Sequence, residues 1–328
     1  MNFQELTRIS SGFAEARILQ VSVKLGIFDA IKEEGSSSEE IARAIRTDPR
    51  ATELLLNALV ALKILEKKEK KFFNTEVSAK YLVKASPRYL GYMILFEESL
   101  WGTWEKLEDS IRTGQPARPS DMFQSREEET QRFIMAMHSL VRARGDAEKM
   151  CEIIDFGAIK SLIDIGSGPG TYPIEFIKKH PHLKITILDL PNTLKITRKI
   201  LKEEGVLDSI EIIEGDYNRD PIPSGFDMAF LSNIIHSEDE ETNRQLIKKI
   251  YDSLNNNGQI VIKDHILDDT LTNPPVGAIF SILMLLVTRG RAYSFGEVKN
   301  WLEEAGFKEI EWKKLEPPLT SSLVIGYK

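Results

Sequence analysis

A run of closely spaced glycines follows an apolar segment near the middle of the chain. The run is Asp164-Ile-Gly-Ser-Gly-Pro-Gly170, and Ser161-Leu-Ile leads into it. Glycine at every second position leaves little side-chain bulk between the loop backbone and a ligand lying over it. A short strand that enters such a loop predicts a binding site for a nucleotide-like cofactor.

Strand and helix patterns alternate from about residue 158 onward. Apolar runs predict strands at 161–165, 184–188, 210–213, 226–231, 259–263 and 323–327. Helical periodicity predicts helices at 172–179, 194–204, 240–254 and 295–305. This alternation indicates an α/β fold with a Rossmann-like, doubly wound parallel sheet and helices on both faces. Ligands of such sheets bind beyond the carboxyl ends of the strands, where the strand order reverses.

The N-terminal part has the order helix, helix, helix, hairpin, which is typical of a winged helix. Ser36-Ser-Ser-Glu39 is expected to cap one helix, and Asp48-Pro49 to start another that covers 51–65. Residues 67–75 predict the hairpin. A DNA-binding winged helix presents basic and polar side chains from its third helix. Here that helix is dominated by Leu and Ala, so we expect it to pack or to form an association surface.

Bulk composition argues against several classes of protein. The formal net charge of -7 opposes binding to a phosphate backbone. The longest uncharged apolar run, 278–287, is about half the length that spans a bilayer. The N-terminus lacks a secretory pattern, Cys151 is the only cysteine, and the histidines never show H-x-x-x-H spacing. We therefore expect a cytoplasmic protein with no metal site and no nucleic-acid or membrane partner.

The glycine loop differs from the loops that bind phosphate. No Lys-Ser or Lys-Thr follows Gly170, and glycines at 166, 168 and 170 do not have dinucleotide spacing. Asp164 stands just ahead of Gly166, where a carboxylate would repel a pyrophosphate but suit a cation. S-adenosylmethionine carries an amino group and a sulfonium, and it fits this chemistry. We assign Asp164, Gly166, Gly168 and Gly170 to its site.

Further acids follow the next two predicted strands. Asp189, followed by Leu190, is placed to accept hydrogen bonds from both ribose hydroxyls. Asp216 can accept from the adenine amino group, with Tyr217 against the ring. The alternative for each acid is that it only caps a turn, and this alternative carries more weight for Asp216 than for the three acids together.

These motifs resemble those of class I S-adenosylmethionine-dependent methyltransferases. With its winged helix, the whole chain resembles the small-molecule O-methyltransferases, among them plant caffeic acid and flavonoid enzymes, acetylserotonin methyltransferase and bacterial hydroxyneurosporene-type enzymes. The resemblance implies an intertwined homodimer. It also implies a winged-helix dimerisation domain over 1–84, a helical connector contributing to the substrate pocket over 85–157, and an S-adenosylmethionine-binding catalytic domain over 158–328.

A candidate base follows the fourth strand, and a candidate acid follows the fifth. If these strands are neighbours, as the family fold implies, His236 and Asp264 emerge side by side. A histidine there can take a proton from a hydroxyl, and the carboxylate can fix its tautomer. The resemblance implies this catalytic pair, and we place Ser232 in the cofactor site. The alternative is a helix-capping histidine beside the acidic residues 238–240.

The chain departs from the plant enzymes around this pair. They follow their histidine with Asp-Trp, whereas Ser237-Glu238 stands here, and their second acidic partner falls near Ala292. The segment around Tyr293 resembles a bacterial branch instead. Tyr293 is expected to hydrogen-bond the substrate or His236, or else to anchor the next helix.

Several apolar and aromatic residues are candidates for the substrate pocket. The resemblance implies that Met284 contacts substrate, and His138 is expected to face the same pocket or to be a hydrogen-bonded helix residue. Phe96 and Trp101 belong to an aromatic stripe that can line it. His265 should point away from Asp264, because neighbouring strand residues alternate in direction.

The sequence favours a homodimeric, metal-independent methyltransferase that acts on a hydroxyl of an apolar, aromatic small molecule. C-methylation of an aromatic or tetrapyrrole-like molecule is the alternative reaction. A winged-helix regulator that senses S-adenosylmethionine is opposed by the acidic charge, and a NAD-dependent oxidoreductase is opposed by the glycine spacing.

Overall fold

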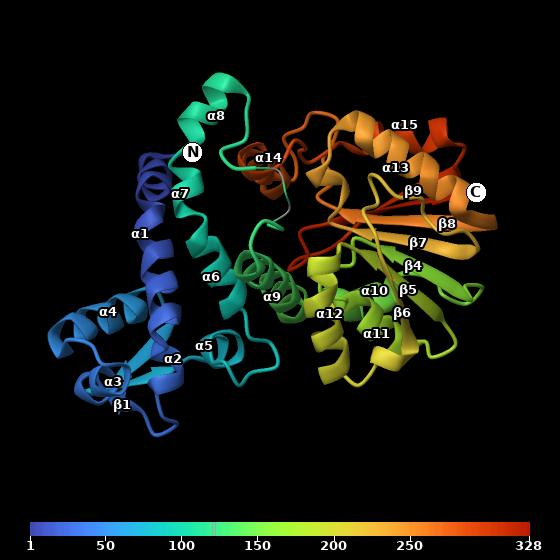
Figure 1. Ribbon diagram of the computed structural model, residues 1–328. Helices are drawn as coiled ribbons and strands as arrows, with labels where there is room; N and C mark the ends of the chain where they lie inside the picture. The colour runs from blue at the N-terminus through green and yellow to red at the C-terminus, as the bar shows by residue number, and fades with distance from the viewer. Residues whose placement is uncertain (120, 122) are drawn as a thin grey trace. The chain divides into compact units, whose positions relative to one another are not determined.

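The computed structural model describes residues 1–119, 121 and 123–328. These residues divide into two compact units, Met1–Leu100 and Trp101–Lys328 (Figure 1). The smaller unit holds the expected helices and hairpin, and the larger unit holds the expected α/β sheet. The finer division at residues 84 and 157 stays a prediction.

The N-terminal unit begins with the long helix α1 and ends with α6. Its elements are α1 (Phe3–Leu25), α2 (Ile27–Ala30), β1 (Ser36–Ser37), α3 (Ser38–Ile45), α4 (Pro49–Ala61), β2 (Leu65–Lys68), β3 (Lys71–Asn74), α5 (Glu76–Tyr81) and α6 (Gly91–Ser99). The strands form a small antiparallel sheet in the order β1-β3-β2. The predicted hairpin is therefore present, and β1 adds a strand that the sequence pattern did not indicate.

Local sequence signals explain where these helices start. Asp48 accepts a hydrogen bond from the Ala51 N–H and caps α4, with Pro49 in its first turn, as expected. The cap of α3 lies one residue later than predicted, because Ser37 and Glu40 form the capping box while Ser36 pairs with Phe72 in the sheet. Leu56 and Leu59 of α4 are fully buried, so much of the apolar character of this helix is explained by packing.

The larger unit starts with helices that precede its sheet. They are α7 (Trp101–Trp104), α8 (Leu107–Thr113), α9 (Glu127–Arg144) and α10 (Asp146–Ile153). Helix α14 (Pro275–Val287), which lies much later in the chain, packs against α7 and α8. The apolar run near residue 280 is thereby placed in a helix within this unit.

Among the described residues, the main sheet has seven strands in the order β6-β5-β4-β7-β8-β10-β9. They are β4 (Ser161–Ile165), β5 (Lys184–Asp189), β6 (Ile210–Glu214), β7 (Phe226–Ser232), β8 (Leu254–Asp264), β9 (Lys308–Lys314) and β10 (Ser322–Tyr327). The strand order reverses between β4 and β7, which is where a doubly wound sheet binds its ligand. The α/β, Rossmann-like prediction is confirmed.

The expectation of a wholly parallel sheet was wrong at its C-terminal edge. Strands β8, β10 and β9 pair antiparallel. No helix separates β9 from β10, so the chain returns by a short connection, which only antiparallel pairing allows. The sequence reading missed β9 because only Ile310 and Trp312 interrupt its charged residues, as suits an edge strand.

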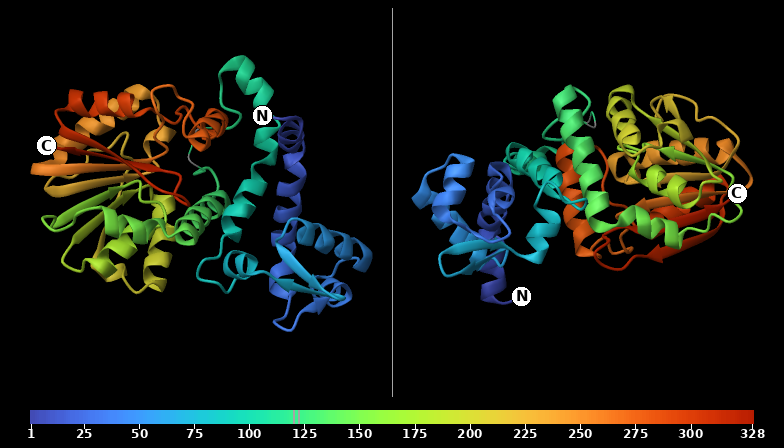
Figure 2. Two further views of the ribbon diagram at one scale, coloured as in Figure 1. Left: turned by 180° about the vertical axis from the view of Figure 1, so that it is seen from behind. Right: turned by 90° about the horizontal axis from the view of Figure 1, so that it is seen from below.

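Helices cover both faces of the sheet (Figures 1 and 2). Helices α9, α10, α11 (Thr171–Lys179) and α12 (Pro191–Glu203) contribute to one apolar cluster, and α13 (Glu240–Ser253) and α15 (Phe295–Ala305) contribute to the other. Alternate residues of each strand enter the two clusters. In β7, for example, Phe230 joins the first cluster and Leu231 the second.

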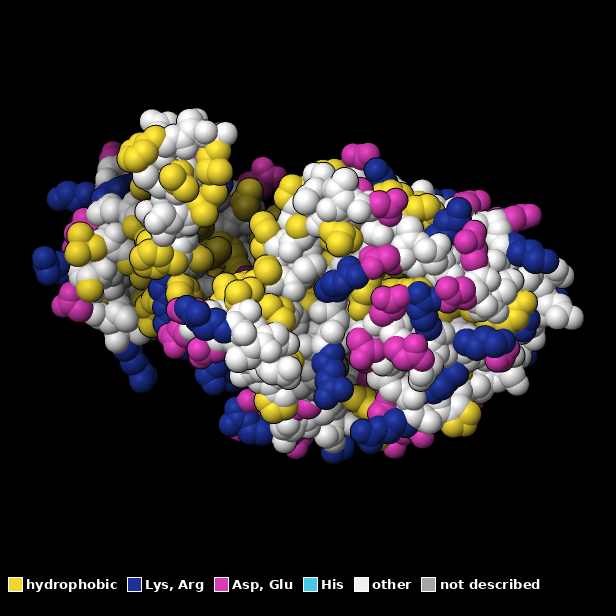
Figure 3. All heavy atoms as spheres, turned by 90° about the horizontal axis from the view of Figure 1, so that it is seen from above, with side chains coloured by type: hydrophobic (Ala, Val, Ile, Leu, Met, Phe, Trp, Pro, Cys, Tyr) yellow, Lys and Arg dark blue, Asp and Glu magenta, His cyan; other side chains and the backbone are white. Residues whose placement is uncertain are grey.

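The outer faces of α13 and α15 carry charges of both signs. Lys and Arg side chains are interspersed with Asp and Glu over this face (Figure 3). Arg244 of α13 pairs with Glu240 and with Glu304, so the two helices are also joined at the surface. This mixture gives the face no single-sign field of the kind that attracts a nucleic-acid backbone.

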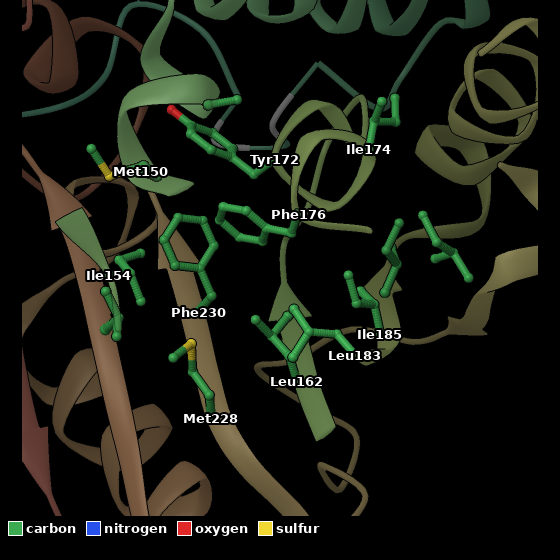
Figure 4. Close-up of a cluster of buried hydrophobic side chains, with 14 of the residues drawn as sticks. Met150, Ile154, Leu162, Tyr172, Ile174, Phe176, Leu183, Ile185, Met228 and Phe230 are labelled. Atoms are coloured by element: carbon green, nitrogen blue, oxygen red, sulfur yellow. The ribbon is translucent and has the colours of Figure 1, made fainter. Parts of the chain in front are cut away.

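The first apolar cluster includes side chains of α11, the helix that follows the glycine loop. Figure 4 shows Tyr172 and Phe176 of α11 beside Phe230 of β7, with Met150 of α10 nearby. The ring centroids of Tyr172 and Phe230 lie 5.3 Å apart, as do those of Phe176 and Phe230. Close packing of aromatic rings fixes α11, and therefore the end of the loop that precedes it.

A buried ion pair crosses this cluster. The Lys263 ammonium lies 3.2 Å from the Asp146 carboxylate, donates to the Ser321 hydroxyl at 3.1 Å, and lies 5.6 Å from the centroid of the Tyr172 ring. Lys263 and Asp146 are almost inaccessible to water. Burial by itself lowers the pKa of Lys263, but the neighbouring oxygens of Tyr172 and Asp146 outweigh it and the pKa is raised. Lys263 therefore stays charged and joins β8 to α10.

We expect Asp146→Ala to lower the free energy of unfolding by about 3–5 kcal/mol, because it leaves a buried ammonium without its counter-charge. Urea denaturation followed by circular dichroism would measure the loss. Glu152→Ala, on the exposed side of the same helix, is the control and should change stability by less than about 1 kcal/mol. Adding Lys263→Met should restore most of the loss. Equal, small effects of both alanine variants would contradict a stabilising role for the pair.

Candidate functional site

The glycine loop leaves β4 at Ile165 and enters α11 at Thr171. Gly166, Gly168 and Gly170 all have positive φ, at 67°, 58° and 73°. At Gly166 a side chain is excluded twice, since a Cβ would strain the backbone and lie 2.3 Å from the Ile234 Cδ1 atom. The close approach shows that the segment after β7 lies directly against the loop.

Asp164 lies in β4 just before the loop and is 1% exposed. Its Oδ2 atom accepts a hydrogen bond of 2.6 Å from the Ser167 hydroxyl, whereas Oδ1 is buried with no hydrogen-bond partner in the described part of the chain. Burial raises the pKa of Asp164 to about 7, with Ser167 opposing and Asp189 reinforcing the shift. A buried, unpaired acceptor oxygen calls for a donor, and an ammonium group fits it.

Asp189 ends β5 and hydrogen-bonds the loop. Its Oδ2 accepts from the Gly168 N–H and its Oδ1 from the Leu190 N–H, both at 2.7 Å. Burial raises the pKa of Asp189 to about 6 despite these bonds. Each carboxylate oxygen has a further lone pair, so Asp189 can hold the loop and still accept from hydroxyl groups. Thr197 of α12 donates to the Gly168 carbonyl and fixes the loop from the other side.

Asp216 and Tyr217 follow β6 with different surroundings. The Asp216 carboxylate accepts from the Asn218 N–H at 2.9 Å and lies 3.4 Å from the Arg219 guanidinium, so it stabilises its own turn, as the alternative interpretation expected. The Tyr217 ring packs beside Gly166, and its hydroxyl donates to Glu238 at 2.9 Å. Tyr217 therefore lies beside the loop.

Ser232 and His138 lie near the two ends of the loop region. Ser232 ends β7 beside Lys263 of β8, and its hydroxyl accepts from the Asn233 amide at 3.2 Å. His138 of α9 lies with Nδ1 2.8 Å from the hydroxyl of Thr171, the first residue of α11. Burial, assisted by Arg142, lowers the pKa of His138 to about 4, so its ring is neutral at physiological pH. The described contacts of His138 are those of a hydrogen-bonded helix histidine.

His236 and Asp264 lie side by side, because β7 and β8 are parallel neighbours. His236 belongs to the short helix η2 (Ile235–Ser237) that follows β7. Its ring atom Nδ1 lies 2.7 Å from Asp264 Oδ1, and its backbone N–H donates to Asp264 Oδ2 at 3.4 Å. Burial alone would raise the pKa of Asp264, but His236 outweighs it and the pKa is lowered. The carboxylate is therefore ionised and orients Nδ1, which leaves Nε2 as the basic nitrogen.

Residues after α14 hold the backbone of this histidine segment. A Cβ at Gly290 would lie 2.2 Å from the His236 carbonyl oxygen, so only glycine allows the observed approach. The Tyr293 hydroxyl donates to the Glu238 carbonyl at 2.7 Å. From the sequence, His236 was one expected partner of Tyr293, but the hydroxyl bonds the Glu238 carbonyl instead. Ala292 is buried, with its N–H bonded to the Ser281 hydroxyl.

The sequence reading missed Phe280 and misplaced His265. The Phe280 ring meets the His236 ring edge to face at 4.8 Å between centroids, and it lies 4.5 Å from the His265 ring. Both histidines thus contact one phenylalanine. The expectation that His265 points away was wrong, because β8 ends at Asp264 and the strand alternation no longer applies. The apolar periodicity of 278–287 was the available signal for Phe280.

The remaining pocket candidates lie in different places. Met284 is buried in a cluster with Leu286 and Val287, against which Phe280 and Leu107 pack. Trp101 starts α7, a helix that packs on α14. Phe96 is buried in the N-terminal unit, on α6. The larger unit thus brings Met284 and Phe280 together near His236.

Within residues 1–119, 121 and 123–328, no group of three or more His, Cys, Asp or Glu side chains is arranged to hold a metal ion. Over the same residues, no helix has both the length and the apolar character that a membrane span requires.

Comparison with known proteins identifies the family. Residues 104–308 match the O-methyltransferase domain, and residues 7–84 match the O-methyltransferase dimerisation domain. The chain is 29% identical to 3-hydroxy-5-methyl-1-naphthoate 3-O-methyltransferase of Streptomyces sahachiroi, over 98% of this chain and 94% of that one. It is 28% identical to acetylserotonin O-methyltransferase of Gallus gallus, over 95% and 94%. Its fold is that of human N-acetylserotonin methyltransferase in complex with SAM (TM-score 0.90, 24% identity, 99% and 97% covered).

The chain therefore belongs to the O-methyltransferase family. It is an S-adenosylmethionine-dependent methyltransferase, and the prediction of this class from the sequence is confirmed. The matched dimerisation domain covers most of the N-terminal unit.

We expect the affinity for S-adenosylmethionine to rise with pH between about 5.5 and 8. Below neutral pH, most free protein molecules hold a proton on Asp164, whose pKa is about 7, and a smaller fraction hold one on Asp189, whose pKa is about 6. A cation favours the ionised carboxylates, so binding releases protons below these pKa values. Calorimetry in two buffers of different ionisation enthalpy would count them.

Asp164→Asn should bind more weakly and with a flatter pH dependence, whereas Asp155→Asn, an exposed control, should behave as wild type. Proton uptake on binding, or an unchanged pH dependence in Asp164→Asn, would contradict the assignment.

Proposed function

We propose that this enzyme methylates a hydroxyl group of an apolar aromatic small molecule, with His236 as general base and Asp264 as its orienting partner. The hydrogen bond of 2.7 Å between His236 Nδ1 and Asp264, beside the glycine loop, is the observation that carries the proposal. The contact of Ile234 with Gly166 supports it, because it brings the base segment next to the cofactor loop.

The residues around the loop fit the cofactor. Asp164 has a buried acceptor oxygen for the amino group, and Asp189 has lone pairs for ribose hydroxyls. Gly166, Gly168 and Gly170 carry no side chains that would separate the loop backbone from a ligand. Leu190, Asp216, Tyr217 and Ser232 are the further residues that we assign to the cofactor site. When bound, S-adenosylmethionine supplies an electrophilic methyl group on a positively charged sulfur.

The base makes the acceptor a better nucleophile. A phenol has a pKa near 10 and is mostly protonated at neutral pH. His236 Nε2 takes the hydroxyl proton, and the ionised Asp264 stabilises the imidazolium that forms. Assistance of this kind is typically worth about 10²–10⁴ in rate. The edge of Phe280 against the His236 ring restricts the orientation of the base.

An aromatic acceptor is supported by the side chains near the base. Phe280 of α14 contacts the His236 ring, and Met284 belongs to the cluster against which Phe280 packs. Both side chains offer apolar, polarisable contacts to a flat ring. The relatives named above act on a hydroxynaphthoate and on acetylserotonin. We include Trp101 among the pocket residues, while Phe96, His138 and Tyr293 remain candidates without a described contact to His236.

We further propose that the chain forms a homodimer through its N-terminal domain. Helix α1 exposes large apolar side chains over its first half, and a monomer would leave them in water. They are Phe3, Leu6, Ile9 and Phe13, and Met1, which precedes the helix, is exposed as well. The match of residues 7–84 to a dimerisation domain supports this surface as the interface.

We also propose a domain division at residues 84 and 157, a reaction that needs no metal ion, and a cytoplasmic location.

We expect His236→Gln to lower kcat by about 10²–10⁴ while leaving the affinity for the cofactor unchanged, because the residue acts on the acceptor. Radiolabelled methyl transfer to a panel of phenols would measure turnover, and calorimetry would measure binding. The exposed His182→Gln is the control and should keep full activity. Near wild-type turnover of His236→Gln, with methyl transfer still rate-limiting, would exclude the base.

The triple variant Leu6→Ser, Ile9→Ser, Phe13→Ser should shift the protein from dimer to monomer, because it removes exposed apolar area from one helix face. Light scattering coupled to size-exclusion chromatography would report the mass. Leu271→Ser changes an exposed apolar residue of the catalytic unit and should leave the dimer intact. A triple variant that remains dimeric would exclude this face as the interface.

A further inference from the structure

We propose that Glu238 is a positioning residue that couples the cofactor-side loop after β6 to the segment carrying the base. Glu238 stands two residues after His236. Its Oε1 atom accepts hydrogen bonds from the Tyr217 hydroxyl and from the Asn218 side-chain amide, both at 2.9 Å. One carboxylate oxygen therefore joins the two regions. The inference rests on the proposed function, since it takes the cofactor to lie over Gly166.

The backbone of Glu238 is fixed independently of its side chain. Its carbonyl accepts from the Tyr293 hydroxyl at 2.7 Å and from the Asn243 amide at 3.2 Å. The same Asn243 amide also donates to the Ile235 carbonyl at 2.8 Å, and Gly290 packs against the backbone of Glu238. The Glu238 carboxylate thus extends from a fixed backbone segment, so its hydrogen bonds hold Tyr217 and Asn218 of the loop after β6 in place.

Lys249 is a second charged residue that holds the loop after β6. The Lys249 ammonium of α13 donates to the carbonyls of Tyr217, Asn218 and Asp220, at 2.8, 3.1 and 3.0 Å. Lys249 therefore holds the loop backbone, whereas Glu238 holds the loop side chains. Removing Glu238 should leave the loop in place but release the Tyr217 ring.

The Tyr217 ring is the part of the loop that reaches the cofactor site. Its Cε1 atom would lie 3.5 Å from a Cβ at Gly166, so the ring stands at the edge of the glycine loop. Burial, reinforced by Glu238, raises the pKa of Tyr217 well above its ordinary value, so the hydroxyl remains a donor. A hydrogen bond to an ionised acceptor is stronger than one to a neutral group. Glu238 thereby fixes the ring before the cofactor binds.

The test measures binding of S-adenosylhomocysteine by calorimetry, which requires no turnover. Glu238→Ala should weaken binding about ten-fold, the order expected for losing hydrogen bonds to a charged acceptor. Glu238→Gln keeps an acceptor oxygen at the same place and should recover most of the affinity. Glu241→Ala removes the same charge from an exposed position three residues on, and it should bind as wild type.

A double-mutant cycle separates positioning from general stability. In a Tyr217→Phe background, Glu238→Ala should cost clearly less affinity than in wild type, because the shared hydrogen bond is already absent. Wild-type affinity of Glu238→Ala would overturn the proposal. So would failure of Glu238→Gln to recover binding, or strict additivity with Tyr217→Phe.

The proposal fails separately from the assignment of the base. Weakened binding in Glu238→Ala together with full turnover of His236→Gln would support the coupling and remove His236 as base. Unchanged binding in Glu238→Ala together with an inactive His236→Gln would overturn the coupling and leave the base in place.

Discussion

The parallel pairing of β7 with β8 is the constraint on which the proposed reaction centre depends. It sets the carboxyl ends of two strands side by side, and the chain leaves both ends with polar side chains. His236 and Asp264 meet there without any long loop to position them. Asp264 ends β8, and His236 lies in the short helix η2 after β7, where hydrogen bonds fix its backbone. A pair fixed in this way loses little entropy when it orients a substrate. Lys263 lies on the opposite face of β8, where its ion pair with Asp146 joins this strand to α10.

The cofactor side is built on shared contacts. Asp189 accepts from the loop backbone and retains lone pairs, so one side chain shapes the loop and is also free to accept from the ligand that we propose for it. Gly166 admits Ile234, which brings the base segment against the loop. Because single residues serve two neighbours, a change at the cofactor side is expected to affect the base segment as well. This coupling distinguishes a preorganised site from two independent binding surfaces.

The sequence predicted the elements whose signal is local. Glycine spacing, acids after strands and apolar alternation indicated the loop and β4 to β8, and the family resemblance implied the His236–Asp264 pair. The edge strand β9 was missed because its residues are mostly charged, and the pairing direction of β10 depends on a connection that periodicity does not report. Contacts made across the fold were also beyond the sequence. Nothing in the chain order indicates that the Phe280 ring meets the His236 ring or that Tyr293 bonds the Glu238 carbonyl, whereas the turn at Asp216 was already an alternative from the sequence.

The two buried acids give the free enzyme an electrostatic cost that the proposed contact with a cationic cofactor offsets. Burial raises the pKa of Asp164 to about 7 and that of Asp189 to about 6, above the range of an unfolded chain. Carboxyls with raised pKa values favour the folded state at low pH, and this contribution is lost as the pH rises through the folded values. Burial is the main cause of both shifts, so at neutral pH the ionised fraction of these carboxyls is buried without a counter-charge. We propose that a bound cation supplies that counter-charge, so that the two acids favour a positively charged ligand.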